Sequence, residues 1–117
     1  MATLPDETIT ERLAALPGWA REGDEIVKTF EFPSFTEAIF FVDRVADEAE
    51  AVNHHPDLDI RYRKVRVALS THDQGGITDK DFALARRIEE TALWRPPGGG
   101  PLEGTPNKFV RSGDPRS

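Results

Sequence analysis

The stretch that decides the fold is SFTEAIFFVDRVADEAEAVNHHPDLDIRY, residues 34–62. Its first part, residues 34–53, predicts a long amphipathic helix, because apolar side chains recur every three or four positions for about five turns. Ser34 and Glu37 have the spacing of a capping box, which predicts where this helix begins. The predicted inner stripe of the helix is Phe35, Ala38, Ile39, Val42, Val45, Ala46, Ala49 and Val52.

Two aromatic residues of this helix, Phe40 and Phe41, lie partly outside the inner stripe. They leave two interpretations open. Either the helix presents a wide face to the core, or an exposed aromatic side chain contacts another subunit. Both interpretations keep the helix and differ only in what covers the two rings.

All three histidines of the chain, His54, His55 and His72, lie within one window that also holds carboxylates. Histidine can donate and accept a proton near neutral pH, so this window is a candidate for acid–base chemistry. His55 precedes Pro56, and a residue before proline is biased to an extended backbone. Adjacent side chains of an extended segment point in opposite directions. We therefore expect His54 and His55 to serve different parts of a site rather than to chelate one metal ion.

Two further helices are predicted on either side of the long one. Thr8 and Glu11 have capping-box spacing, and so do Thr78 and Asp81. Pro17-Gly18 is expected to end the first of these helices, because proline cannot continue the hydrogen-bond ladder. The three predicted helices cover residues 5–16, 34–53 and 78–90.

Alternation of apolar and polar side chains predicts four strands. Val65, Val67 and Leu69 alternate with polar residues, which is typical of a sheet with one buried face. Lys28 interrupts the apolar face of the second strand and indicates a position near the edge of the sheet. His72 follows the fourth strand directly. The predicted strands cover residues 19–22, 25–32, 59–62 and 64–71.

The element order is therefore α-β-β-α-β-β-α, which predicts an α+β fold: a four-stranded antiparallel sheet with helices packed on one face. After Trp94 the composition changes, because prolines and glycines cluster there. We expect one domain over residues 1–94 and an irregular Pro/Gly-rich C-terminal tail over residues 95–117. Phe109 and Val110 are the apolar residues of that tail that we expect to anchor it.

Composition excludes several classes of function. The net charge of −6 and the pI near 5.0 argue against a nucleic-acid binder and against a protein that anchors on an anionic membrane. The absence of cysteine excludes disulfides, thiolate catalysis and cysteine-based zinc sites. The N-terminus lacks the apolar run of a signal peptide, and no segment is apolar enough to span a bilayer. A cytoplasmic protein is expected.

The spacing of the polar residues resembles the signature of the pterin-4a-carbinolamine dehydratase family. The signature consists of a carboxylate, a His-His-Pro segment, an aromatic residue, a third histidine and a final aspartate. The context agrees, with Gly18-Trp19 after the first helix and a Leu-Ser-Thr-His segment at 69–72. The resemblance covers about residues 13–92. The matching residues are Glu50, His54-His55-Pro56, Tyr62, His72 and Asp81.

This resemblance implies dehydration of 4a-hydroxytetrahydrobiopterin to quinonoid dihydrobiopterin, a step that recycles the pterin used by aromatic amino acid hydroxylases. It also implies a homodimer or homotetramer, with a pterin as substrate and no metal or organic cofactor. One residue departs from the family pattern. Leu58 stands where family members often carry an aromatic residue, which weakens ring stacking on the pterin but removes no proton-transfer group.

Loss of water from a carbinolamine requires one proton delivered to the leaving hydroxyl and one removed from the neighbouring ring nitrogen. Imidazole can perform either step near neutral pH. We expect His54 and His72 to form the main acid–base pair, His55 to bind the pterin and assist, and Glu50 to orient an imidazole. The residues expected to bind substrate, in part through their backbone, are His54, His55, Pro56, Thr71, His72, Asp73 and Asp81.

Simpler interpretations of three residues stay open. Asp81 could serve helix capping alone, Glu50 could be a surface charge, and Tyr62 could pack on the sheet. A second function is also open: a non-catalytic binding or assembly protein on the same fold, such as a dimerisation cofactor or a carboxylase assembly chaperone. The intact set of histidines and carboxylates favours catalysis, because a pure interaction protein has no physical need for it.

Overall fold

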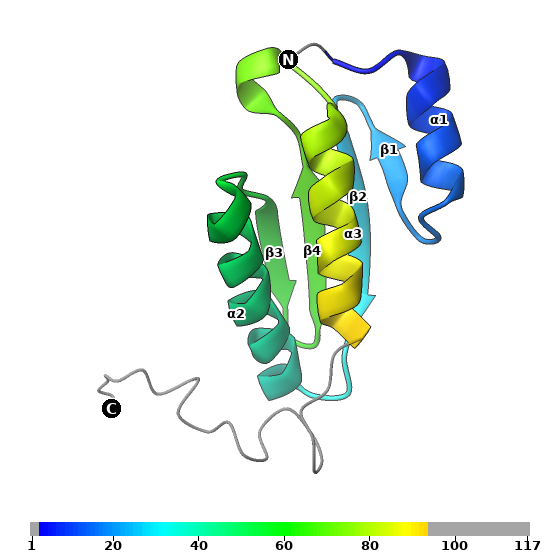
Figure 1. Ribbon diagram of the computed structural model, residues 1–117. Coiled ribbons are helices and arrows are strands. Elements are labelled where there is room, and N and C mark those ends of the chain that lie inside the picture. The colour runs from blue at the N-terminus through cyan, green and yellow to red at the C-terminus, as the bar shows by residue number, and fades with distance from the viewer. Residues whose placement is uncertain (1–2, 94–117) are drawn as a thin grey trace.

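A computed structural model describes residues 3–93 of the chain (Figure 1). The order of helices and strands confirms the predicted α+β arrangement, while the expected tail at 95–117 lies outside the described residues. The elements are α1 (Asp6–Ala14), β1 (Ala20–Glu22), β2 (Glu25–Glu31), α2 (Phe35–Val52), β3 (Asp57–Arg61), β4 (Lys64–Leu69), the short 3-10 helix η1 (His72–Gln74) and α3 (Asp79–Leu93).

The four strands form one antiparallel sheet in the order β1-β2-β4-β3. The prediction that Lys28 marks a strand near the edge is confirmed, because β1 pairs with β2 only up to Val27 and residues 28–31 of β2 pair with β4 alone. The Lys28 ammonium group finds polar partners within the protein. It lies 2.5 Å from a Glu89 carboxylate oxygen and 3.2 Å from the Pro17 carbonyl oxygen. Its stem passes over the Phe30 ring, with the ammonium 4.8 Å from the ring centroid.

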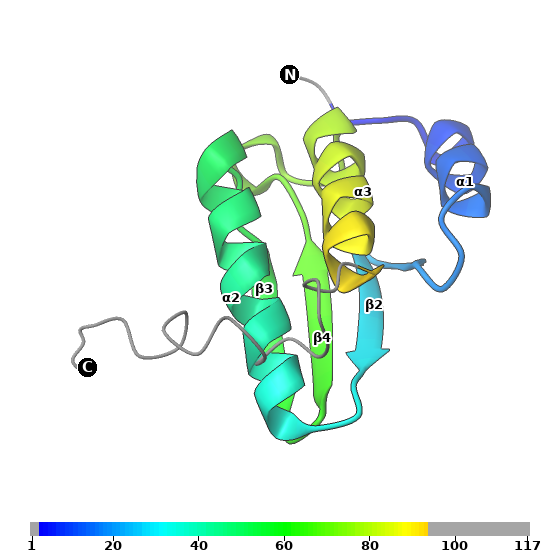
Figure 2. The ribbon, with the colours of Figure 1, turned by 60° about the horizontal axis from the view of Figure 1, so that its bottom comes forward.

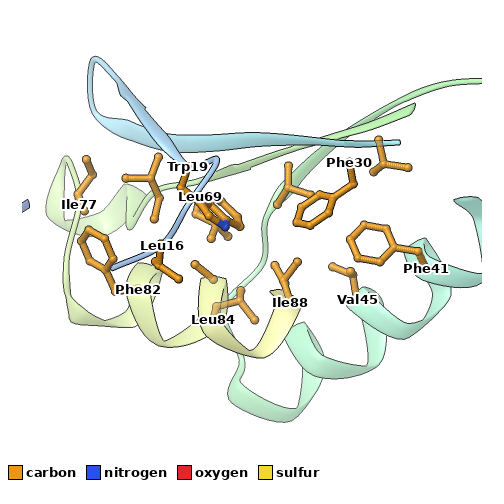
Figure 3. Packing of buried hydrophobic residues seen from close by; sticks show 14 of the residues in the cluster. Leu16, Trp19, Phe30, Phe41, Val45, Leu69, Ile77, Phe82, Leu84 and Ile88 are labelled. Atoms are coloured by element: carbon orange, nitrogen blue, oxygen red, sulfur yellow. The ribbon is translucent and has the colours of Figure 1, made fainter. Parts of the chain in front are cut away.

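Helices α2 and α3 lie side by side across one face of the sheet (Figures 1 and 2). The apolar core fills the space between these helices and the central strands (Figure 3). Val65, Val67 and Leu69 of β4 have no exposed surface, which confirms the alternation predicted for that strand. The other strand and helix residues in the core include Ile26, Phe30, Phe41, Val45, Phe82, Leu84 and Ile88.

The predicted start of α2 is confirmed, because the Ser34 hydroxyl accepts a hydrogen bond from the Glu37 amide at 3.2 Å. Phe40 and Phe41 are 5% and 3% exposed, so the interpretation as core residues is correct. Phe35 differs from its predicted place in the inner stripe and is 48% exposed. It is the first residue of the helix, and its ring stacks on the exposed Tyr62 ring with centroids 6.5 Å apart.

The predicted capping box of α1 is wrong. Pro5 occupies the N-cap position without a side-chain hydrogen bond, and Thr8 lies inside the helix because the helix begins before it. The helix packs beside α3 through the Arg12 guanidinium. This group forms an ion pair with Asp79, and its central carbon lies 5.8 Å from the centroid of the Phe82 ring. All three helices therefore belong to the same side of the molecule.

Candidate active site

The end of α2 determines where the histidine pair lies. Asn53 adopts a left-handed conformation (φ 53°, ψ 46°), and asparagine tolerates this conformation better than most residues. The His54 amide donates to the Ala49 carbonyl at 3.1 Å, which closes the last turn. The chain then reverses into β3, so His54 leaves the helix in the direction of α3.

The His54 side chain contacts the first turn of α3. Its Nε2 atom lies 2.6 Å from Oδ1 of Asp81, and the two side chains are 10% and 0% exposed. An isolated buried carboxylate is strongly unfavourable, so a carboxylate at this depth requires hydrogen-bond donors and a positive partner. His54 is the side chain that meets one of its two oxygens.

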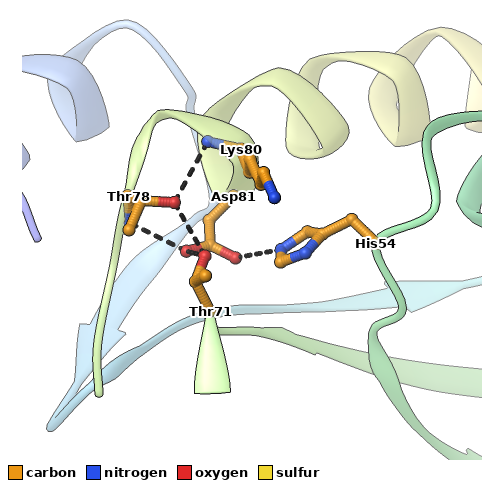
Figure 4. A network of polar contacts seen from close by, with 5 residues as sticks. All are labelled: His54, Thr71, Thr78, Lys80 and Asp81. Carbon is orange, nitrogen blue, oxygen red and sulfur yellow. Dashed lines mark hydrogen bonds and ion pairs between the residues drawn. The ribbon is translucent and has the colours of Figure 1, made fainter. Parts of the chain in front are cut away.

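The second oxygen of Asp81 is also satisfied (Figure 4). Oδ2 accepts hydrogen bonds from the Thr71 hydroxyl and from the Thr78 amide, each at 2.9 Å. The bond to Thr78 is the capping contact that the sequence predicts for α3. Asp81 therefore caps the helix and holds His54 at the same time, so helix capping alone is not its role. Its side chain is fully buried, and its contact with the site runs through His54 rather than to a substrate.

The second imidazole–carboxylate pair is formed by His55 and Glu50. The His55 Nε2 atom lies 2.6 Å from a Glu50 carboxylate oxygen, and the side chains are 56% and 76% exposed. Glu50 therefore partners an imidazole, but it is that of His55 rather than that of His54, which Glu50 precedes by one helical turn. His54 and His55 contact different helices, which is the divergence predicted from the extended backbone before Pro56.

His72 begins η1, in a loop that a backbone bridge closes. The Thr71 amide donates to the Gly76 carbonyl at 2.8 Å, and Gly75 makes the tight turn with φ 76°. Within residues 3–93 no side chain forms a hydrogen bond to the His72 ring, which is exposed. The imidazole therefore lies at the protein surface without a protein partner in the described part of the chain.

These segments surround one cleft of about 290 Å³. The cleft has the size at which protein sites for small molecules begin. Two of its residues, Asn53 and Ser70, are not among the sequence predictions. Ser70 could have been predicted from the sequence, because it lies two residues before His72, at the end of the strand that leads into the loop. The residues that line the cleft are Asn53, His54, His55, Ser70, His72 and Asp73.

The structure places four of the sequence-predicted substrate-binding residues on this cleft: His54, His55, His72 and Asp73. Thr71 lies beneath it, with a side chain that is 2% exposed, and Pro56 does not line it. Tyr62 lies in the β3–β4 turn, is 70% exposed and is absent from the cleft lining. The Tyr62 side chain therefore neither packs on the sheet nor contacts this cleft.

Two findings concern the described residues as a whole. Within residues 3–93, no group of three or more histidine, aspartate or glutamate side chains is arranged to hold a metal ion. In the same part of the chain, no helix combines the length and hydrophobicity needed to cross a membrane.

Fold and cleft together define a class: a small α+β domain that presents several imidazoles to solvent, one of them backed by a buried carboxylate. The family model for pterin 4 alpha carbinolamine dehydratase matches residues 2–91. The chain belongs to the pterin-4a-carbinolamine dehydratase family, as the spacing of its polar residues predicts.

Bacterial relatives agree with this assignment. A protein of Roseiflexus castenholzii is 61% identical over 89 residues, which cover 76% of this chain and 96% of the relative. A protein of Mycobacteroides abscessus is 54% identical over 89 residues, which cover 76% of this chain and 95% of the relative. Both relatives carry the provisional name pterin-4-alpha-carbinolamine dehydratase.

Two solved structures share the fold. The transcriptional coactivator/pterin dehydratase from Brucella melitensis is 34% identical, with a TM-score of 0.75 over 77% of this chain and 98% of that one. A pterin dehydratase-like protein identified as a RuBisCO assembly factor in the alpha-carboxysome is 22% identical, with a TM-score of 0.54 over 64% of this chain and 87% of that one. The second likeness establishes the fold alone.

Proposed function

We propose that this protein dehydrates 4a-hydroxytetrahydrobiopterin to quinonoid dihydrobiopterin by histidine acid–base catalysis, in tetrahydropterin recycling. The observation that carries the proposal is the pairing of His54 with the buried Asp81, on a cleft that also contains the imidazole of His72, which has no hydrogen-bond partner among the described side chains. The two imidazoles thus share a cleft but differ in environment. Such a difference is what separates an acid from a base in one active site.

His54 is the proposed general acid. Two hydrogen-bond donors on Oδ2 fix the Asp81 carboxylate, and its Oδ1 atom fixes the His54 ring at the cleft. His72 has no such neighbour among the described side chains and is the proposed base. The C4a–O bond breaks as the hydroxyl takes the proton of His54 and leaves as water. The N5 proton of the pterin passes to His72, which releases it to solvent, and solvent returns a proton to His54 before the next turnover.

The remaining cleft residues serve binding in this proposal. His55, held by Glu50, contacts the pterin, and the backbone of residues 54–56 and 71–73 holds its amide edge. We further propose a cytoplasmic homodimer or homotetramer that works beside an aromatic amino acid hydroxylase, which generates the unstable carbinolamine. Membership of the family supports the proposed pterin binding, location, oligomeric state and hydroxylase partner, because all of them belong with the proposed reaction.

The test is a dehydration assay on 4a-hydroxytetrahydropterin that a hydroxylase generates in the same cuvette, with formation of the quinonoid product as readout. The double variant His54→Ala, His72→Ala should lose acceleration, because single acid–base groups contribute about 10²-fold or more each. Arg61→Ala, an exposed change outside the cleft, is the control and should retain the parent rate. An unimpaired double variant would rule out the proposed catalytic pair.

The alternative function is a non-catalytic binding or assembly role. The coactivator description of the Brucella melitensis protein, at 34% identity, is the observation that keeps it in view. A folded parent protein that gives no acceleration in the assay would favour this alternative. The next measurement would then be a search for the protein that it holds.

A further inference from the structure

The hydrogen bonds beneath His54 form a directed chain. The Lys80 amide donates to the Thr78 hydroxyl oxygen at 3.2 Å, and the Thr71 hydroxyl donates to Asp81 at 2.9 Å. Thr71 has one hydroxyl proton, and Asp81 receives it. The contact of 2.7 Å between the two threonine hydroxyls therefore requires Thr78 as donor and Thr71 as acceptor. The Thr78 and Thr71 hydroxyl protons therefore point in turn toward the carboxylate, along the contacts drawn in Figure 4.

This direction has a consequence for Asp81. Its Oδ2 atom accepts two hydrogen bonds, one of which comes from a hydroxyl that is itself polarised by a second hydroxyl. Chains of hydrogen bonds strengthen one another in a medium from which water is excluded. Thr71 is 2% exposed, and Thr78 and Asp81 have no exposed surface. The network therefore fixes the plane in which Oδ1 meets the His54 ring.

We propose that the Thr71 hydroxyl, supported by that of Thr78, is a positioning group that fixes the Asp81 carboxylate and thereby holds the His54 ring oriented toward the cleft. Thr71 acts through Asp81 and touches no reacting atom. Its catalytic consequence rests on the proposed function of His54. Thr71 is among the residues that the sequence predicts to bind substrate. Here its side chain instead positions Asp81.

Other charged groups near His54 do not replace this network. From η1, His72 and Asp73 face the same cleft but lie at its exposed side. From α2, the Glu50 carboxylate lies within 2.6 Å of His55. From α3, Asp81 is the carboxylate within hydrogen-bond distance of the His54 ring. A change at Thr71 should therefore reach His54 through Asp81.

The variants are Thr71→Val, which keeps the shape and removes the hydroxyl, and Thr71→Ser, which keeps the hydroxyl. The first readout is the imidazole nitrogen chemical shifts of His54 at neutral pH, which report the hydrogen bonding of its ring without any substrate. We expect these shifts to change in Thr71→Val and to return to the parent values in Thr71→Ser. Unchanged His54 signals in a folded Thr71→Val protein would overturn the proposal.

The second readout is the dehydration rate. We expect kcat of Thr71→Val to fall roughly tenfold, the effect of losing one hydrogen bond to a charged group, with KM nearly unchanged. Thr71→Ser should restore kcat, whereas equal loss in both variants would indicate a purely structural role. If Thr71→Val does not fold, Thr78→Val tests the same hydrogen-bond chain and should give a smaller change in the His54 chemical shifts; no change would overturn the proposal. A parent without dehydratase activity would refute the proposed function, while the NMR result would still decide the positioning role.

Discussion

The chain contains the same ion pair twice, and the two copies differ in their surroundings. His54 meets Asp81 and His55 meets Glu50, each with 2.6 Å between Nε2 and a carboxylate oxygen. The first pair is 10% and 0% exposed, whereas the second is 56% and 76% exposed. Distance alone therefore says little about what either pair does.

Burial is what separates them. An exposed pair is weakened by water and salt and contributes less than about 1 kcal/mol to stability. A buried pair has no such screening, and removal of one partner leaves the other charge without compensation. Of the two pairs, only that of His54 and Asp81 has further hydrogen bonds to its carboxylate, from Thr71 and Thr78. The His54 ring is therefore held in place by buried groups, whereas the ring of its sequence neighbour His55 is not.

The substitution Asp81→Asn should have the largest effect. The amide oxygen can still accept from Thr71 and Thr78, but the amide nitrogen must then donate to Nε2 of His54. His54 is thereby left neutral with its proton on Nδ1, and its strength as an acid is lost. We expect kcat to fall about 10²-fold or more and the free energy of unfolding to fall by about 1–3 kcal/mol. Steady-state kinetics and urea unfolding measure the two effects.

The matched control for this variant is Glu50→Gln, the same chemical change in the exposed pair. Its free energy of unfolding should change by less than about 0.5 kcal/mol, as is usual for surface substitutions. We expect KM to rise by a small factor, because His55 is proposed to bind the pterin, while kcat stays close to that of the parent. If Glu50→Gln lowered kcat as much as Asp81→Asn, burial would not be what distinguishes the pairs.

The sequence predicts the fold well where a residue pattern acts locally. The period of two in β4 is confirmed. In α2 the predicted stripe is confirmed for Ala38, Val45 and Ala49, whereas Phe35, Ala46 and Val52 are exposed. The edge position predicted from Lys28 is confirmed, but its partners, Glu89 and Pro17, come from other parts of the chain and no pattern within β2 predicts them. Phe35 is misplaced because a helical stripe does not reveal where the sheet beneath it ends.

For the candidate site, spacing identifies the histidines but not their partners. Asp81 is 27 residues from His54, and only the packing of α3 against the end of α2 brings them together. Asn53 and Ser70 reach the cleft through backbone geometry, in one case a left-handed turn. A one-dimensional pattern records neither the direction of such a turn nor the depth at which a carboxylate is buried.

Salt provides the most sensitive comparison of the two pairs. A thermodynamic cycle of Glu50→Gln and His55→Gln should give a small coupling energy, below about 1 kcal/mol, that diminishes as salt is raised to about 0.5 M. The corresponding cycle of Asp81→Asn and His54→Gln should give a larger coupling energy that salt barely changes, because mobile ions cannot approach a carboxylate without exposed surface. Urea unfolding of each single and double variant at low and high salt measures both. If the coupling of His54 with Asp81 fell with salt as steeply as that of the exposed pair, solvent ions would have access to the buried carboxylate, and the assignment of His54 as the protonated acid would lose its physical basis.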